Sequence, residues 1–135
     1  MSLTAWKETY SVNIRELDEQ HRRLLGLVEQ LRTAMRQGRG KEELRRIFDG
    51  LVAYTATHFA REERLMEAHG FPEYEEHKRI HAAMTRKVLD LQRQFHCGRL
   101  GLSLEVLKFL EDWVEKHILG TDKKYGPFLN QRGVT

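Results

Sequence analysis

The chain has 135 residues, the length of one domain with a single buried core. Its 23 basic and 20 acidic residues give a net charge of +3, and they are interleaved, as in KEELRR at 41–46. They therefore indicate solvated helix faces and argue against nucleic-acid binding. The chain has one cysteine, Cys97, no apolar run long enough to cross a bilayer and no secretory signal at its start. We expect a cytoplasmic protein that does not insert into membranes.

The predicted elements begin with an irregular arm over residues 1–14, which carries Trp6 and Tyr10. A first helix is predicted over about 17–37, because apolar residues recur there at steps of three and four. The GRG sequence at 38–40 ends this helix.

A second helix is predicted over about 42–68 and ends at HGFP, where glycine caps the helix and proline cannot continue it. A third follows over about 73–96. After the CGRLG turn, a fourth helix over about 102–119 precedes a C-terminal segment, 120–135. Amphipathic helices joined by short turns predict an all-α, up-down-up-down four-helix bundle, with residues 1–135 as one domain.

Five of the seven histidines fall on the apolar stripes of these helices, and two carboxylates accompany them. An inward imidazole costs roughly 1–3 kcal/mol for each nitrogen without a partner. For a single such residue, an ordinary hydrogen-bonded core histidine is the better interpretation. The convergence of seven donors on one interior layer favours a metal site instead. The donors are His21, His58 with Glu62, His77 with His81, and His117 with Asp122.

The pair His117 and Asp122 has a spacing of five residues, which a continuous α-helix would place on different faces. We expect Gly120 to adopt the left-handed conformation, end the helix and return Asp122 to the core. The alternative role of Asp122 is to cap the short segment DKKYGPF that follows.

The number of donors distinguishes one metal ion from two. A structural zinc takes four donors, which would leave three of the seven unexplained. Two octahedral ions offer twelve positions. If Glu62 and Asp122 both bridge and a hydroxide bridges as well, one position stays open for a small ligand. The nitrogen-rich donor set suits ferrous iron.

These motifs, taken together, resemble the bacterial hemerythrins. The resemblance rests on the aromatic arm before LDEQH, HFxxEE at 58–63, HxxxH at 77–81, and WxxxHxxxxD at 113–122 followed by YGPFL. It covers about residues 3–129.

The resemblance implies a non-heme centre of two iron ions bridged by Glu62, Asp122 and a hydroxide or oxide. His77, His81 and His117 would hold one iron, and His21 and His58 the other. Dioxygen would bind reversibly at the iron held by two histidines.

The resemblance also places four residues in the oxygen pocket: Leu24, Phe59, Trp113 and Val114. Their alternative role is ordinary core packing. We expect Leu24 and Phe59, which follow His21 and His58 closely in the sequence, to screen that iron from water. His69 and His96 are expected to lie outside the site, and the role of Tyr125 is left open.

Three classes of function follow. The first is an oxygen carrier or store, with dioxygen as ligand and an oxygen-consuming enzyme or a reductase as partner. The second is an oxygen or redox sensor, which is less favoured because we expect no signalling domain within 135 residues. The third is a di-iron enzyme that handles peroxide or nitric oxide, which the same ligands would support.

Overall fold

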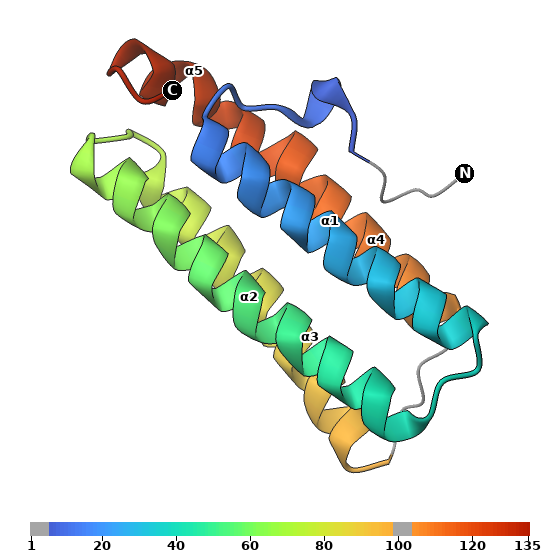
Figure 1. Ribbon diagram of the computed structural model, residues 1–135. Coiled ribbons are helices and arrows are strands. Elements are labelled where there is room, and N and C mark those ends of the chain that lie inside the picture. Colours follow the sequence, from blue (N-terminus) through green and yellow to red (C-terminus); the bar gives the residue numbers. More distant parts are fainter. Residues whose placement is uncertain (1–5, 99–103) are drawn as a thin grey trace.

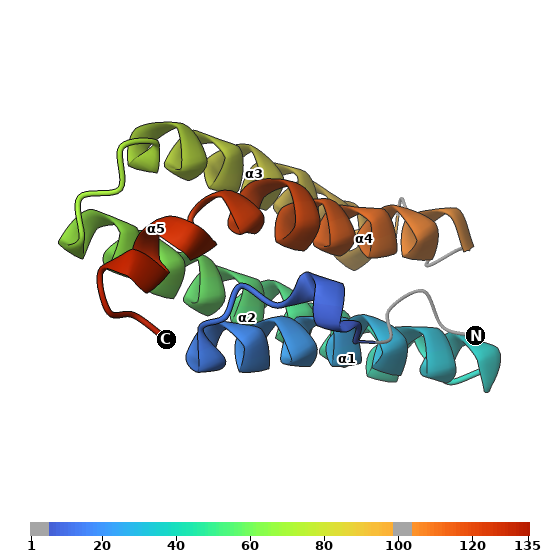
Figure 2. The ribbon, with the colours of Figure 1, turned by 90° about the horizontal axis from the view of Figure 1, so that it is seen from above.

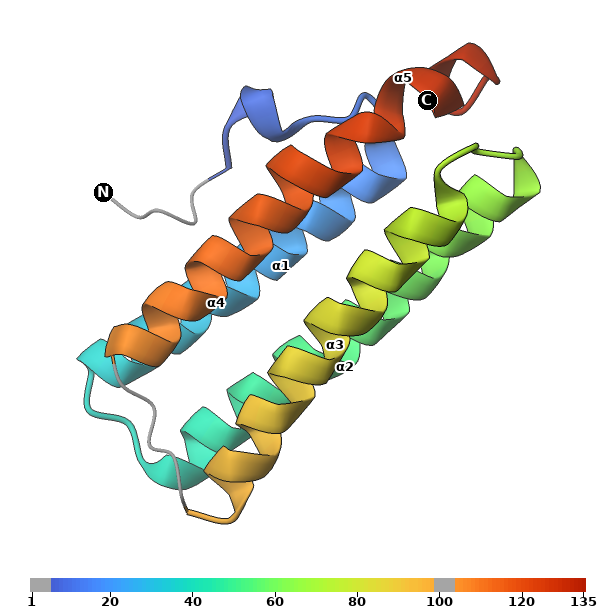
Figure 3. The ribbon, with the colours of Figure 1, turned by 180° about the vertical axis from the view of Figure 1, so that it is seen from behind.

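Four long helices form an antiparallel four-helix bundle, as expected from the sequence (Figures 1 and 3). The computed structural model describes residues 6–98 and 104–135. The helices are α1 (Arg15–Arg36), α2 (Lys41–Ala68), α3 (Tyr74–His96) and α4 (Leu104–Lys116). The expected start of the fourth helix at 102, most of the CGRLG turn and the first five residues of the arm lie outside the described residues.

Short elements close one end of the bundle. A turn of 3₁₀ helix, η1 (Glu8–Tyr10), lies in the arm, which runs alongside α1 and α4 (Figures 1 and 2). After α4 come a π-helical turn, η2 (His117–Thr121), a 3₁₀ turn, η3 (Asp122–Lys124), and a short helix, α5 (Gly126–Gln131). In Figure 2, α5 lies at the end of the bundle where α1 begins.

The arm is held against two helices of the bundle by polar contacts. The Tyr10 hydroxyl donates to Glu115 on α4 at 3.2 Å, and the Val12 amide donates to Asp18 on α1 at 2.9 Å. The backbone also packs closely, because a Cβ at Gly126 would lie only 3.2 Å from the Val12 carbonyl oxygen. Glycine at this position therefore lets α5 approach the arm.

The apolar stripes pack into two clusters, one at each side of a polar layer. The first cluster fills most of the bundle and contains Leu24, Phe48, Phe59 and Leu110, among others. The second lies at the end closed by the arm and α5, and it consists of Val12, Ile14, Leu17, Met66, Phe71, Tyr125 and Leu129. The polar layer is thus enclosed by apolar side chains on both sides.

The turn after α4 differs from the sequence prediction. Gly120 does not adopt the left-handed conformation, so that expectation is wrong. Instead, the helix widens to a π turn, in which the backbone N–H of Asp122 donates to the carbonyl of His117. A hydrogen bond across five residues widens the turn by one residue and brings two side chains spaced by five onto one face. The spacing in HILGTD therefore matches the local helix geometry without a break in the chain.

Within the described residues, no helix is both long and apolar enough to span a membrane.

A matched pair of glycine substitutions tests the π turn. At both Gly120 and Gly70, an added Cβ would meet nothing within 4 Å, but only Gly70 has a positive φ, of +69°. Gly120→Ala should therefore leave stability unchanged or raise it by about 0.4–1 kcal/mol. Gly70→Ala should cost about 1–2 kcal/mol, because alanine is strained in the left-handed region. Urea unfolding of both variants measures this difference in stability. An equal loss of stability at the two positions would contradict the π turn and favour the left-handed conformation at Gly120.

Candidate metal centre

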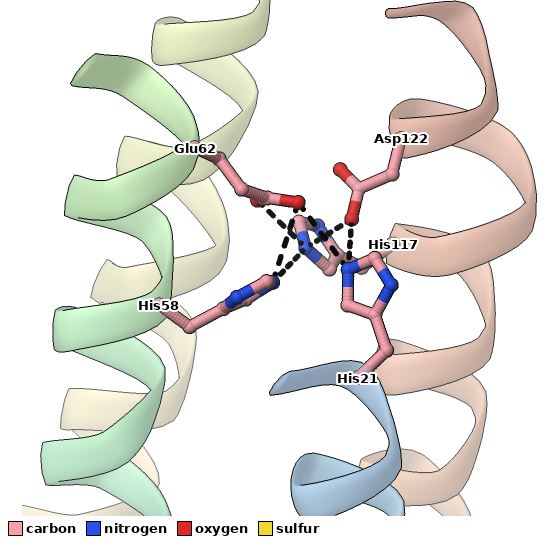
Figure 4. A group of neighbouring side chains, drawn as sticks. All are labelled: His21, His58, Glu62, His117 and Asp122. Atoms are coloured by element: carbon pink, nitrogen blue, oxygen red, sulfur yellow. Dashed lines mark hydrogen bonds and ion pairs between the residues drawn. The ribbon is translucent and has the colours of Figure 1, made fainter. Parts of the chain in front are cut away.

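All seven predicted donors lie in the polar layer at the centre of the bundle. Each side chain is at most 3% exposed. Figure 4 shows five of them, which point toward one another from four different elements. His21 comes from α1, His58 and Glu62 from α2, His77 and His81 from α3, His117 from η2, and Asp122 from η3.

The donors form two overlapping groups, each with its ligand atoms within 4.8 Å of one another. Glu62 and Asp122 are the members that the two groups share. The first group adds His21, His58 and His117, and the second adds His77 and His81. Two carboxylates that belong to both groups are arranged as bridging ligands of a dinuclear centre would be.

Each oxygen of Glu62 faces a different pair of imidazoles. Its Oε1 lies 3.2 Å from the Nε2 atoms of His81 and His117. Its Oε2 lies 3.3 Å from the Nε2 atoms of His21 and His58. The carboxylate therefore divides these four histidines into two pairs, with one oxygen directed at each pair.

Asp122 makes a similar division on the other side of the layer. Its Oδ1 lies 3.2 Å from the Nε2 of His77. Its Oδ2 lies 2.6 Å from the Nε2 of His21 and 2.8 Å from that of His117. His117 therefore stands between the groups, since it shares an oxygen with His81 at Glu62 and with His21 at Asp122.

Hydrogen bonds do not satisfy every donor atom of the centre. The Nε2 atoms of His58 and His117 share one hydrogen bond at 3.3 Å. In the described part of the chain, the buried atoms Glu62 Oε1, His81 Nε2 and Asp122 Oδ2 have no hydrogen-bond partner. Lone pairs directed at a common centre suit a cation better than one another, because a metal ion accepts electron pairs from all of them. The donor set therefore fits a bound metal.

Two of the imidazoles are oriented by partners on their outer nitrogen. The Nδ1 of His81 lies 2.8 Å from Oε2 of Glu63, and the Nδ1 of His58 lies 2.7 Å from Oε1 of Gln20. Both partners accept, so Nδ1 carries the proton and the Nε2 lone pair faces the centre. The sequence analysis missed both partners. The sequence feature that could have indicated them is that each is a polar residue directly next to a donor in the chain. In the structure both are half-buried.

Burial strongly affects the protonation of the donor side chains. It lowers the pKa of His58, and it lowers the pKa of His77 to about 3. Burial alone would raise the pKa of Glu62, but the His58 and His117 imidazoles outweigh it and hold that pKa well below its usual value. Burial and the adjacent Glu62 raise the pKa of Asp122. His58 and His77 are thus neutral at pH 7, the form that binds a metal.

Tyr125 belongs to the centre through one contact. Its hydroxyl is buried and donates to Oε2 of Glu62 at 2.5 Å. Burial and the charges of Asp122 and Glu62 raise the pKa of this hydroxyl well above its usual value, so it remains a donor. Tyr125 is therefore a partner of Glu62 rather than an additional metal donor.

The four expected pocket residues are all buried. The Phe59 ring is parallel to that of His81, with 3.9 Å between centroids, and its centroid lies 6.0 Å from that of His58. Phe59 thus covers the His81 side of the centre. The exposed fractions of Leu24, Trp113 and Val114 are 1%, 7% and 0%.

Two surface grooves are lined in part by donors of the centre. One, of about 430 Å³, lies between α3 and α4 and is lined by Met84, Phe109, Trp113 and His117, among others. The other, of about 410 Å³, lies between α2 and α3 and is lined by Phe59, Glu63 and His81, among others. His69 and His96 lie outside both donor groups, and His96 pairs with Asp49 at 2.7 Å.

The chain matches known proteins over nearly its whole length. A family model described as the hemerythrin HHE cation binding domain matches residues 12–129. The bacteriohemerythrin of Methylococcus capsulatus is 30% identical over 131 residues, which cover 96% of this chain and 99% of that protein. The bacteriohemerythrin of Stenotrophomonas maltophilia is 33% identical over 125 residues, or 93% of this chain and 80% of that protein.

Solved structures agree with the sequence relatives. A crystal structure of wild-type hemerythrin has a TM-score of 0.87 and 30% identity to this chain, and the match covers 96% of this chain and 97% of the other. Two structures of mutant hemerythrins reach a TM-score of 0.89 at 31% identity, with 96% and 98% covered. The chain therefore belongs to the hemerythrin family, and its buried cluster of histidines and carboxylates fits a non-heme di-iron site.

Proposed function

We propose that the centre binds two iron ions bridged by Glu62, Asp122 and a hydroxide or oxide, and that it binds dioxygen reversibly. The observation that carries the proposal is that the two donor groups share only their carboxylates. A bridging carboxylate gives one oxygen to each ion, which is the arrangement of the Glu62 oxygens toward the two histidine pairs. Imidazole donors in excess over carboxylates suit ferrous iron.

In this proposal, His77, His81 and His117 hold one iron, and His21 and His58 hold the other. By distance His117 groups with His21 and His58, but the Glu62 contacts support its placement with His81, because both imidazoles face the same oxygen. The iron with two histidines then keeps a position for dioxygen. When bound, the iron pair supplies the electrons for reversible dioxygen binding.

The surroundings of the centre favour a carrier, store or delivery protein. Leu24 and Val114 belong to the apolar cluster beside the polar layer, and the donors are almost fully excluded from solvent. A dry surrounding protects a bound oxygen species from water, so that dioxygen can leave again. The partners are then dioxygen and an oxygen-consuming enzyme or a reductase. A sensor or a peroxide- or nitric-oxide-handling enzyme would use the same donors, and the third test below separates a carrier from an enzyme.

The first test is metal content and its link to stability. The protein should bind two iron ions per chain, and their removal should lower stability because the buried donors lose their common partner. The expected fall in Tm is about 10 °C, the shift for a ligand at about 100 times its Kd in a domain of this size. Iron analysis and thermal unfolding with and without chelator measure both quantities. One iron per chain, or an unchanged Tm, contradicts the proposal.

The second test concerns the bridges. Glu62→Gln or Asp122→Asn removes a negative charge that offsets two cations and weakens a shared ligand. Iron occupancy should fall, and the remaining iron should oxidise faster in air. The matched control is His69→Ala, which removes a histidine outside both donor groups. Loss of iron from His69→Ala would refute the assignment of the donors.

The third test separates a carrier from an enzyme. The visible absorption of the oxygenated wild-type protein should disappear under vacuum and return with air. Leu24→Ser should admit water and speed the decay of that spectrum with little loss of iron. Leu31→Ser is the control, because Leu31 is also fully buried but lies roughly 15 Å from His21 along α1, against about 4.5 Å for Leu24. Rapid wild-type decay with consumption of peroxide would favour the enzyme.

A further inference from the structure

The two oriented imidazoles of the centre have outer partners of different charge. His81 donates to a carboxylate, Glu63, and His58 donates to a neutral amide, Gln20, at almost the same distances of 2.8 and 2.7 Å. A carboxylate on Nδ1 gives the imidazole partial negative charge and makes Nε2 a stronger electron donor. An amide oxygen has this effect to a much smaller degree. The two sides of the centre therefore offer donors of unequal strength.

The His81 imidazole is also the more rigidly held of the two. Phe59 stacks on its face, with an angle of 1° between the ring planes, while Glu63 holds its outer edge. Glu63 follows Glu62 directly on α2. One helix therefore supplies both a carboxylate of the centre and the carboxylate that accepts from the Nδ1 of His81. Glu63 is 23% exposed, which keeps its second oxygen near solvent.

Tyr125 also makes the two sides of the centre unequal. Its hydroxyl donates to Oε2 of Glu62, the oxygen that faces His21 and His58. A hydrogen bond donated to a carboxylate oxygen withdraws charge from that oxygen and leaves it the weaker ligand. Oε1, which faces His81, is among the buried atoms without a hydrogen-bond partner in the described structure. The more negative oxygen of Glu62 thus lies on the side of Glu63.

We propose that Glu63 is a positioning residue which, with Gln20 and Tyr125, polarises the centre so that the metal ion beside His81 is held more tightly and oxidised more easily than the ion beside His58. The inference rests on the proposed function only in requiring two metal ions. Stronger negative charge around one ion stabilises its higher oxidation state, and it slows the release of that ion. The two ions would then differ in affinity and in ease of oxidation although they share their bridging ligands.

Removal of iron from the iron-loaded, full-length protein tests whether the two ions are held with unequal affinity. Wild type should lose its two ferrous ions to a competing chelator in two separate steps. Glu63→Gln keeps the hydrogen bond to His81, since an amide oxygen still accepts it, but removes the charge. The later step should then occur at about 10–100-fold lower chelator concentration, the usual effect of an outer partner on metal affinity. Glu67→Gln, the same change one turn along α2 at an exposed position, should match wild type.

The opposite change tests the other side of the centre. Gln20→Glu places a carboxylate beside the outer nitrogen of His58. The earlier step of iron loss should then move to higher chelator concentration, and the difference in chelator concentration between the two steps should become smaller. A redox titration of the iron-loaded proteins gives a second measurement. The first iron to oxidise should do so at a higher potential in Glu63→Gln than in wild type. Tyr125→Phe should make the ion beside His58 easier to oxidise.

Equal behaviour of Glu63→Gln and Glu67→Gln in both measurements overturns the inference, and so does an equal weakening of both ions by Glu63→Gln. If wild type oxygenates reversibly and Glu63→Gln has no effect, only this inference fails. If Glu63→Gln reduces the difference between the two steps but wild type does not bind dioxygen reversibly, the proposed function fails and the inference stands.

Discussion

The burial of two carboxylates and five imidazoles in one layer is the constraint on which the structure depends. An ionised carboxylate without a partner costs several kcal/mol in such surroundings, and Glu62 and Asp122 also repel each other. Imidazoles offset part of this cost, yet several buried atoms of the centre have no hydrogen-bond partner in the described structure. The pair of cations that we propose would give these atoms a common partner.

The two apolar clusters make this layer possible. Along α1, His21 stands between Leu17 of the end cluster and Leu24 of the larger one, and along α2, Glu62 stands between Met66 and Phe59 in the same way. At this level of α1 and α2, donors therefore take positions on the stripe that apolar residues occupy on either side. Apolar burial stabilises the helices in place, and the donors meet because they occupy the same level of the bundle.

The sequence allowed prediction of what depends on regular spacing within one helix. Apolar stripes predicted the four helices, and donors on those stripes had to point inward. The turn after α4 was not predicted correctly, because a glycine between two donors spaced by five residues fits both a left-handed cap and a π turn. Glu63 and Gln20 escaped prediction for another reason: they lie beside the stripe, and their partners are on neighbouring helices. The stacking of the Phe59 ring on His81 also depends on packing between α2 and α3, which spacing within one helix does not reveal.

The π turn shows how closely the last donor is tied to the rest. Because the Asp122 amide donates to the His117 carbonyl, neither side chain can shift along the helix without the other. His117 contacts an oxygen of each carboxylate, so its position couples the two halves of the centre. The following residues extend this coupling, since Tyr125 reaches back to Glu62 and α5 packs on the arm. One segment of about ten residues thus connects both carboxylates to the closed end of the bundle, and a regular helix there would turn Asp122 away from the centre.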